Sequence, residues 1–204
     1  MSLAQKVKRY TPQEYYVLER AAAYKSDYYD GEIFAMSGGT SRHSLISANI
    51  SGETRHRLKG RPCTVYESNQ RIKVIATGLR CYPDVSIYCD EIKYDPEDIG
   101  SETAVNPTIV FEVLSKTPEG YDRGFKADNY RQIESLRAYV FVSQTAPHVE
   151  VNRREDDGDW KLHVTKGLDM SVEIPGIGVT LPMAEIYDKV NFGQVSEEDG
   201  QVPE

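Results

Sequence analysis

The chain has 204 residues, of which 39% are hydrophobic and 27% charged, and it carries a formal net charge of −8. These fractions are typical of a globular domain rather than a disordered chain. The acidic balance argues against a protein that coats nucleic acid, because such binding depends on neutralising many phosphates. No apolar run approaches the ~18 residues that span a bilayer. The start of the chain lacks the apolar core of a signal peptide, so we expect a cytoplasmic protein without membrane contact.

The composition along the chain predicts one domain over residues 1–190 and an acidic, frayed tail over residues 191–204. The cysteines are odd in number and show no metal-type spacing. They lie in or beside predicted strands, which favours reduced core thiols over disulfides or a zinc site. The three residues are Cys63, Cys81 and Cys89.

The first half of the chain begins with a helix, because Thr11 is a good N-cap, Pro12 suits the first helical position and Glu14 completes a capping box. An Asp-Gly pair between two alternating segments then indicates a tight hairpin. In chain order, the pattern predicts a helix to about Ala23, a hairpin of 24–29 with 32–36, a helix over 41–58, and strands over 63–67 and 70–75 that turn at Asn69.

The second half predicts a strand over 82–88, a long acidic loop over 90–106, and a dense apolar strand over 108–115. A loop of that length is more often functional or mobile than tightly packed. A helix with apolar residues at helical spacing follows over 125–136, then a strand over 138–142. The segments 149–153 and 160–164 flank an Asp-Asp-Gly-Asp turn, which predicts a hairpin that extends the sheet.

Glu112 is the most informative residue, because it lies in the middle of the apolar strand and an ionised carboxylate there costs several kcal/mol, roughly, unless a positive group lies against it. Asp84 is likewise a single acid beside the apolar run of the preceding strand. Lys126 follows within a basic segment. Two acids on neighbouring strands and a lysine are the minimum for binding a divalent metal and hydrolysing a phosphodiester.

Five motifs in this order resemble the Uma-two family of restriction-endonuclease-like proteins, within the PD-(D/E)XK nuclease superfamily. The resemblance covers residues 11–187 and implies a mixed α/β fold, with a core of helix, three strands, helix and strand. The N-terminal helix and hairpin and the C-terminal β extension are additions to that core. The motifs are Asp30-Gly31-Glu32, His43 at the start of a helix, Tyr82-Pro83-Asp84-Val85, Phe111-Glu112-Val113-Leu114-Ser115, and Asp122-Arg123-Gly124-Phe125-Lys126 with Tyr130.

The resemblance implies that Asp84 and Glu112 bind Mg²⁺ or Mn²⁺ and that Glu32 is a further ligand or a base that orients water. The superfamily usually places its lysine two residues after the second acid, where this chain has Leu114. We therefore expect Lys126 to serve as the catalytic lysine, with Lys116 as the alternative. The expected supporting residues are His43, Ser115 and Tyr130.

The function expected from these residues is metal-dependent hydrolysis of DNA by a homodimer. Arg123 and Arg131 flank the predicted lysine and are expected to contact the DNA backbone, and residues 55–61 form a second basic segment. Two alternatives remain open: a nuclease-derived binding or assembly module without turnover, and a hydrolase of a smaller phosphoester. Convergence of the two acids and the lysine in an open cleft would favour the nuclease.

Overall fold

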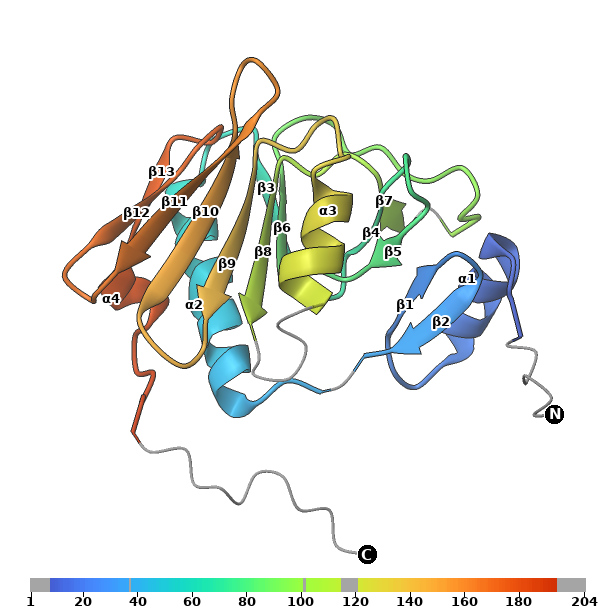
Figure 1. The fold of residues 1–204 in the computed structure, drawn as a ribbon, viewed down its shortest axis with the longest axis horizontal. Helices are drawn as coiled ribbons and strands as arrows, with labels where there is room; N and C mark the ends of the chain where they lie inside the picture. Colours follow the sequence, from blue (N-terminus) through green and yellow to red (C-terminus); the bar gives the residue numbers. More distant parts are fainter. Residues whose placement is uncertain (1–7, 37, 101, 115–120, 194–204) are drawn as a thin grey trace, which may run out of the picture.

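The computed structural model describes residues 8–36, 38–100, 102–114 and 121–193 (Figure 1). Within them, no helix is long and apolar enough to cross a membrane. The elements are α1 (Pro12–Ala21), β1 (Ser26–Tyr29), β2 (Glu32–Ala35), α2 (Ser41–Arg57), β3 (Thr64–Glu67), β4 (Arg71–Lys73), β5 (Arg80–Cys81), β6 (Val85–Tyr88), β7 (Thr103–Ala104), β8 (Ile109–Leu114), a π-helical turn η1 (Tyr121–Lys126), α3 (Ala127–Tyr130), β9 (Ala138–Ser143), β10 (His148–Arg154), β11 (Trp160–Lys166), β12 (Ser171–Ile174), β13 (Val179–Pro182) and α4 (Met183–Ile186).

A six-stranded sheet forms the centre of the molecule, in the order β11-β10-β9-β8-β6-β3. The β8–β9 pair is parallel and the other neighbours are antiparallel, so the sheet is mixed as predicted. Every residue of β8 is buried, because both faces of the sheet are covered at this strand. The acid at its centre, Glu112, is therefore removed from water.

One face of this sheet packs on α2, α4 and the β12–β13 hairpin. Thr40 caps α2 by accepting a hydrogen bond from the backbone N–H of His43, and Ile46 and Ile50 of α2 are fully buried against the strands. The cap fixes where α2 begins, and that start lies at the end of the sheet where β8 finishes (Figure 1).

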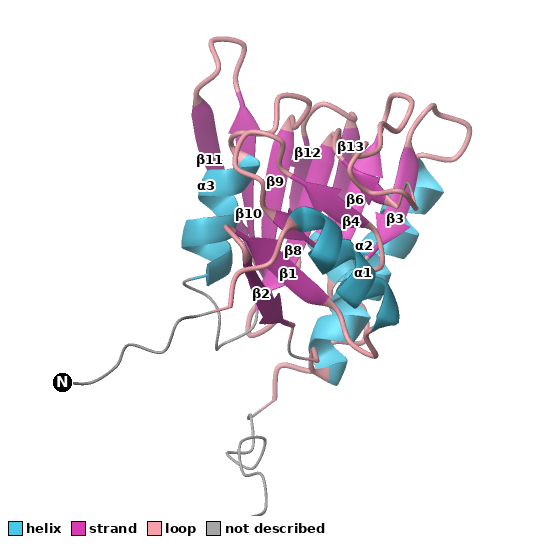
Figure 2. Cartoon of the chain, turned by 90° about the vertical axis from the view of Figure 1, so that its right-hand side faces the viewer, coloured by secondary structure: helices cyan, strands magenta, loops and turns pink. Residues whose placement is uncertain are grey.

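The opposite face packs on α3 and on a five-stranded sheet of order β2-β1-β5-β4-β7. Figure 2, viewed from that side, shows the β1–β2 hairpin and α1 in front of the larger sheet. Strands β3 and β4 are consecutive in the chain but belong to different sheets. The predicted helix over 125–136 begins earlier, at η1, and ends with α3.

The prediction of three reduced cysteines is wrong, because Cys63 and Cys89 form a disulfide. These residues flank the paired strands β3 and β6, in which Thr64 lies opposite Tyr88. Continuing that antiparallel register by one residue brings the two cysteines face to face. Cys81 is free and buried, as predicted.

The acidic segment 90–106 is anchored by buried polar contacts, whereas its length predicted a functional or mobile loop rather than a tightly packed one. The carboxylate of Asp95 accepts hydrogen bonds from the Tyr16 hydroxyl at 2.5 Å and from the Lys73 ammonium at 2.9 Å. Asp98 is fully buried and pairs with Arg20 at 2.8 Å and with Arg71 at 2.9 Å. Because Tyr16 and Arg20 belong to α1, the acids join this segment to the N-terminal helix.

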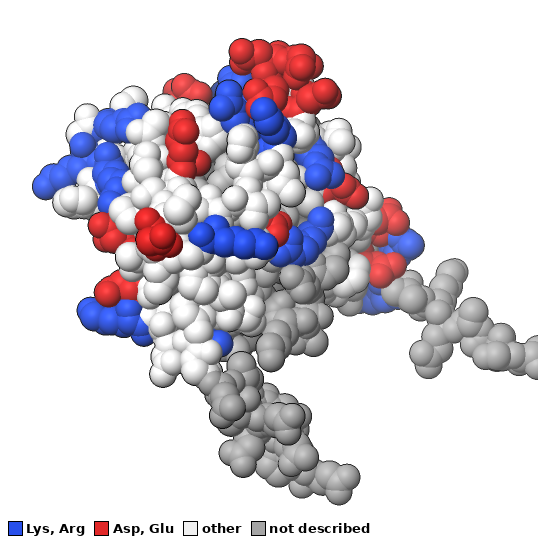
Figure 3. All heavy atoms as spheres, turned by 60° about the vertical axis from the view of Figure 1, so that its left-hand side comes forward, with Lys and Arg blue, Asp and Glu red and all other residues white. Residues whose placement is uncertain are grey.

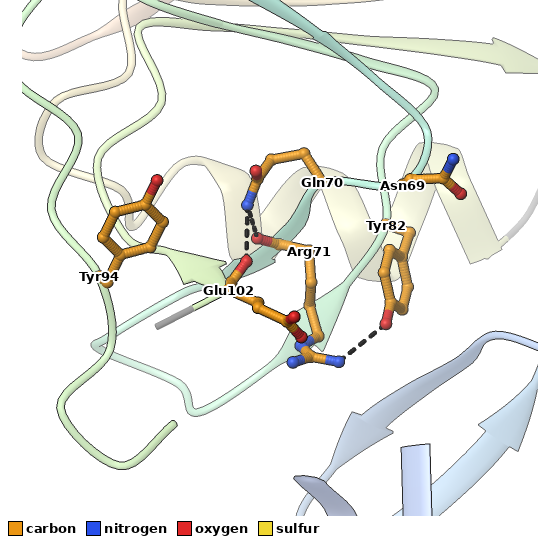
Figure 4. A pocket seen from close by; sticks show the side chains of 6 residues that line it. All are labelled: Asn69, Gln70, Arg71, Tyr82, Tyr94 and Glu102. Carbon is orange, nitrogen blue, oxygen red and sulfur yellow. Dashed lines mark hydrogen bonds between the residues drawn. The ribbon is translucent and has the colours of Figure 1, made fainter. Parts of the chain in front are cut away.

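The guanidinium of Arg71 links this network to β4 and β5. It donates to Thr103 at 2.6 Å, to the Tyr82 hydroxyl at 2.8 Å and to Asp98 at 2.9 Å. Figure 4 shows the bond to Tyr82 at the wall of a polar cavity of about 370 Å³, where Gln70 reaches the backbone oxygen of Glu102. The polar groups of Arg71 are thus satisfied although its side chain is only 4% exposed.

Replacing Asp98 with asparagine should lower the free energy of unfolding by roughly 3–5 kcal/mol, because the change leaves buried arginine without its counter-charge. Burial alone would raise the pKa of Asp98, but the hydrogen bond from Thr103 and the pairing with Arg71 outweigh burial and hold this pKa below its ordinary value. The stabilisation from the ionised Asp98 carboxylate is therefore complete above its pKa in the unfolded chain, about 3.9. It is lost as the pH falls through the lower pKa that Asp98 has in the folded protein.

Urea titrations of the wild type and Asp98→Asn at pH 7, and at a series of values down to pH 3, measure this difference. Asp156→Asn, at an exposed position of the β10–β11 loop, is the matched control and should change stability by less than about 0.5 kcal/mol. A difference between wild type and Asp98→Asn that grows as the pH falls below 4 would contradict the assignment.

Candidate functional site

Glu112 and Lys126 form a buried ion pair between the larger sheet and the helix that covers it. The Lys126 ammonium lies 3.2 Å from Oε1 of Glu112, and the two side chains are 5% and 6% exposed. Glu112 points toward this face because its neighbours Phe111 and Val113 pack into the core on the opposite face. The prediction that a positive group lies against Glu112 is confirmed, and Lys126 supplies it.

Tyr130 supports the same carboxylate. Its hydroxyl donates to Oε1 of Glu112 and lies 3.6 Å from the Cys81 sulfur. Burial raises the pKa of Tyr130 well above its ordinary value, and the nearby Cys81 and Glu112 raise it further. Burial also raises the pKa of the Cys81 thiol. Tyr130 therefore remains protonated and donates to the carboxylate at physiological pH.

Asp84 lies beside Glu112 on the neighbouring strand. Val85 of β6 pairs with Phe111 of β8, and continuing this register by one residue places Asp84 opposite Glu112. Oδ2 of Asp84 accepts a hydrogen bond from the backbone N–H of Val113 at 2.7 Å. The structure thus brings both predicted metal-binding acids to one end of the sheet.

His43 reaches the same end of the sheet from the first turn of α2. Its Nε2 lies 3.2 Å from Oδ2 of Asp84, and the two side chains are 20% and 13% exposed. His43, expected as a supporting residue, thus contacts one of the two acids. The imidazole is therefore placed to orient the Asp84 carboxylate.

Glu32 lies elsewhere. It begins β2, at the outer edge of the smaller sheet, where its Oε1 lies 3.6 Å from the Arg9 guanidinium. No described contact joins Glu32 to Glu112 or Lys126, and its side chain is 37% exposed. Its role as a ligand or base stays a prediction that this position does not favour.

Asp27 is a residue that the sequence reasoning missed. It lies on β1 and is 3% exposed. Asp27, Glu112 and Lys126 all act electrostatically on the Cys81 thiol, which places the aspartate in the same buried neighbourhood. The available signal was an acid inside an aromatic strand, Tyr24 to Tyr29, the same signal that singled out Glu112.

The two arginines expected to contact DNA are both paired within the chain. Arg123 donates to Glu150 on β10, and Arg131 pairs with Asp128 at 2.8 Å. Their side chains are 35% and 41% exposed, so part of each remains accessible. Figure 3 shows basic and acidic side chains interspersed over one face, with acids gathered at the tip where the β10–β11 loop lies. Contact with DNA by these arginines stays a prediction.

Two predicted residues, Ser115 and Lys116, lie outside the described residues. Among the residues that the structure describes, no three histidine, cysteine, aspartate or glutamate side chains gather closely enough to hold a metal by themselves. Asp84 and Glu112 nevertheless fit a hard divalent cation, because they offer carboxylate oxygens from opposite positions on adjacent strands. Such an ion would need water molecules to complete its coordination.

The Glu112–Lys126 pair should show strong coupling in a double-mutant cycle. Lys126→Met should lower the free energy of unfolding by roughly 3–5 kcal/mol, because Glu112 loses its ammonium partner while buried. Glu112→Gln combined with Lys126→Met should cost clearly less than the sum of the single changes. Urea unfolding measures all four proteins.

Arg131→Met is the control for this cycle, since it removes a cation from an exposed pair and should cost roughly 0–1 kcal/mol. Additive effects of the Glu112 and Lys126 substitutions would show that the two side chains do not stabilise each other.

Comparison with known proteins gives relatives in cyanobacteria. The chain is 34% identical over 183 residues to "Uncharacterized protein slr1290" of Synechocystis, covering 89% of this chain and 93% of the relative. It is 28% identical over 163 residues to "Uncharacterized protein sll1609" of the same organism, covering 80% and 91%.

A crystal structure of "a putative nuclease belonging to DUF820" from Anabaena variabilis has the same fold, with a TM-score of 0.67 over 83% of this chain and 93% of that one at 15% identity. This likeness confirms the expected restriction-endonuclease-like architecture. The family model described as "Uma2: Putative restriction endonuclease" matches residues 12–184. The chain therefore belongs to the Uma2 family.

Proposed function

We propose that this protein is a metal-dependent nuclease that hydrolyses phosphodiester bonds of DNA. The observation that carries the proposal is the pairing of Lys126 with Glu112 beside Asp84, at one end of the central sheet. Lys126, which comes from the covering helix, would then take the place of the lysine that the superfamily usually carries on the strand, where this chain has Leu114.

In this proposal Asp84 and Glu112 hold Mg²⁺ or Mn²⁺ through carboxylate oxygens. When bound, the ion would polarise the phosphate and lower the pKa of a water molecule. His43 and the backbone N–H of Val113 hold the Asp84 carboxylate in place, at 3.2 and 2.7 Å. Tyr130 holds Glu112 in the same way. These contacts restrict both acids before substrate arrives, as preorganised catalysis requires.

Lys126 has two possible tasks, because its ammonium can orient the attacking water or stabilise the negative charge that develops on the phosphate. Both tasks require the ammonium to be shared between Glu112 and the substrate. Lys126 ends η1 and directly precedes α3, so it lies within the covering helix rather than on a loop, and this position limits its movement.

One observation favours the non-catalytic alternative, a binding or assembly module that keeps the fold. Glu112 and Lys126 are 6% and 5% exposed, so the ion pair is closed to solvent rather than open in a wide cleft. A catalytic site needs substrate access to this pair, whereas a structural ion pair does not. Measurements of metal binding and of turnover distinguish the nuclease from the non-catalytic module.

We expect Mn²⁺ to bind weakly to the wild type, and Asp84→Asn or Glu112→Gln to abolish that binding. Both substitutions preserve shape while removing the charge that a hard cation requires. Isothermal titration measures the heats, and Glu32→Gln serves as the control that should retain binding. Equal heats in the wild type, Asp84→Asn and Glu112→Gln would rule out these metal ligands.

We expect Lys126→Ala to reduce the cleavage rate by ~10² or more, as loss of one preorganised electrostatic donor does. Lys116→Ala should have a much smaller effect, and circular dichroism should confirm that both variants fold. Single-turnover cleavage of labelled duplex and single-stranded DNA with Mn²⁺ measures the rates. Greater damage from Lys116→Ala would assign the catalytic role to that lysine instead.

A further inference from the structure

A groove of about 660 Å³ lies between the last turn of α2 and the edge strand β3. Four of its lining residues are basic and none is acidic, although the whole chain carries a net charge of −8. The four basic residues are Arg55, His56, Lys59 and Arg61. A groove on an acidic protein that is lined by basic and no acidic residues favours an anionic ligand.

Two of the basic side chains of this groove are not neutralised by acids of the surrounding chain. In the part that the structure describes, Arg55 and Lys59 have no carboxylate within ion-pair distance, whereas their neighbour Arg57 pairs with both Glu53 and Glu185. The side chains of Arg55 and Lys59 are exposed. Their positive charge is therefore directed to solvent and available to a ligand.

The walls of the groove are held in place. Arg61 donates to the backbone oxygen of Ile177, which fixes its guanidinium without neutralising it. The Cys63–Cys89 disulfide ties the groove's β3 wall to β6. A preformed arrangement of cations loses less freedom when a ligand binds.

Two glycines line the groove. A Cβ atom added at Gly52 or Gly60 would meet nothing within 4 Å, so the backbone at both positions faces free space. Gly52 lies inside α2, where glycine costs about 0.5–1 kcal/mol of stability relative to alanine. A larger residue at Gly52 would therefore fill the groove while favouring the helix.

We propose that this groove binds the sugar-phosphate backbone of a single-stranded nucleic acid. Arg55 lies in the last turn of α2, and Lys59 and Arg61 follow in the segment just after the helix ends at Arg57. This arrangement presents several charges in succession, which suits consecutive phosphates of one strand. We take the ligand to be a single strand because its flexible backbone can bring consecutive phosphates to these closely spaced charges.

The groove is separate from the candidate active site, because the two lie at opposite ends of β6. Asp84 precedes this strand and Cys89 follows it, so the sites are about 17 Å apart at ~3.3 Å per residue. The inference rests on the proposed function only in assigning nucleic acid as the ligand. The groove would hold a strand that the distant acids cleave, and binding can be measured without cleavage.

Fluorescence anisotropy of a fluorescein-labelled 12-nucleotide oligothymidine tests the proposal, with the full chain in Ca²⁺ to prevent turnover. Arg55→Ala with Lys59→Ala should weaken binding roughly tenfold in 50 mM salt and reduce the slope of log affinity against log salt by about 0.7 for each phosphate that is no longer neutralised. Gly52→Glu should also weaken binding about tenfold, because its carboxylate competes with phosphate for Arg55 and His56.

Matched controls separate the groove from total charge and from folding. Lys161→Ala with Lys166→Ala removes two positive charges on β11 and Gln13→Glu adds one negative charge on α1, and neither should change the affinity by more than about twofold. The melting temperature of Gly52→Glu should be equal to that of the wild type or higher. Loss of binding in the groove variants alone supports the proposal.

Hydrolysis of bis(p-nitrophenyl) phosphate with Mn²⁺, measured on the same proteins, distinguishes the groove from the active site. Binding through the groove without any hydrolysis would refute the proposed nuclease activity and leave the groove assignment intact. Wild-type affinity in both groove variants, or no wild-type binding at 20 mM salt, would overturn the groove assignment. An oligoglutamate peptide of equal charge that binds more tightly than the oligonucleotide would assign the groove to an acidic protein and overturn it as well.

Discussion

The interaction on which the rest of the site depends is the burial of the Glu112 carboxylate. A charge in a strand covered on both faces is tolerated only with a partner of opposite charge and with its oxygens hydrogen-bonded. Lys126 supplies the charge and Tyr130 the hydrogen bond, and both come from the helix that covers the sheet. The carboxylate thus fixes the position of this helix, and the helix brings its lysine to the end of the sheet where Asp84 lies.

A second group of buried charges positions the smaller sheet. Arg71 and Asp98 connect β4, the acidic segment and, through Arg20, the N-terminal helix. These contacts hold β1 and β5 against the larger sheet, so that Asp27 and Cys81 enter the neighbourhood of Glu112. The acids that give the chain its negative charge are therefore partly structural. The basic groove at the other end of β6 lies outside both networks, and its unneutralised charge distinguishes it from them.

Local patterns predicted the elements that depend on neighbouring residues. The Thr11 capping box, the Asp30-Gly31 turn and the apolar strand around Glu112 all appear where expected. Contacts between distant residues were not predictable in this way. The Cys63–Cys89 bond has no spacing motif, because it follows from the pairing of β3 with β6 rather than of β3 with β4. The length of the acidic segment predicted a functional or mobile loop, and its anchoring could not be foreseen because the anchoring residues lie up to 79 residues away in the chain.

The central claim is that Asp84 and Glu112 form a metal site served by Lys126. Crystals soaked in Mn²⁺ and measured at a wavelength where manganese scatters anomalously test it most directly. The account predicts one anomalous peak within about 2.5 Å of a carboxylate oxygen of each acid, on the side of Glu112 that Lys126 leaves accessible. A peak elsewhere, or none at saturating Mn²⁺ with the ion pair intact, would show that the buried pair is structural and that the chain keeps the fold of a nuclease without its metal chemistry.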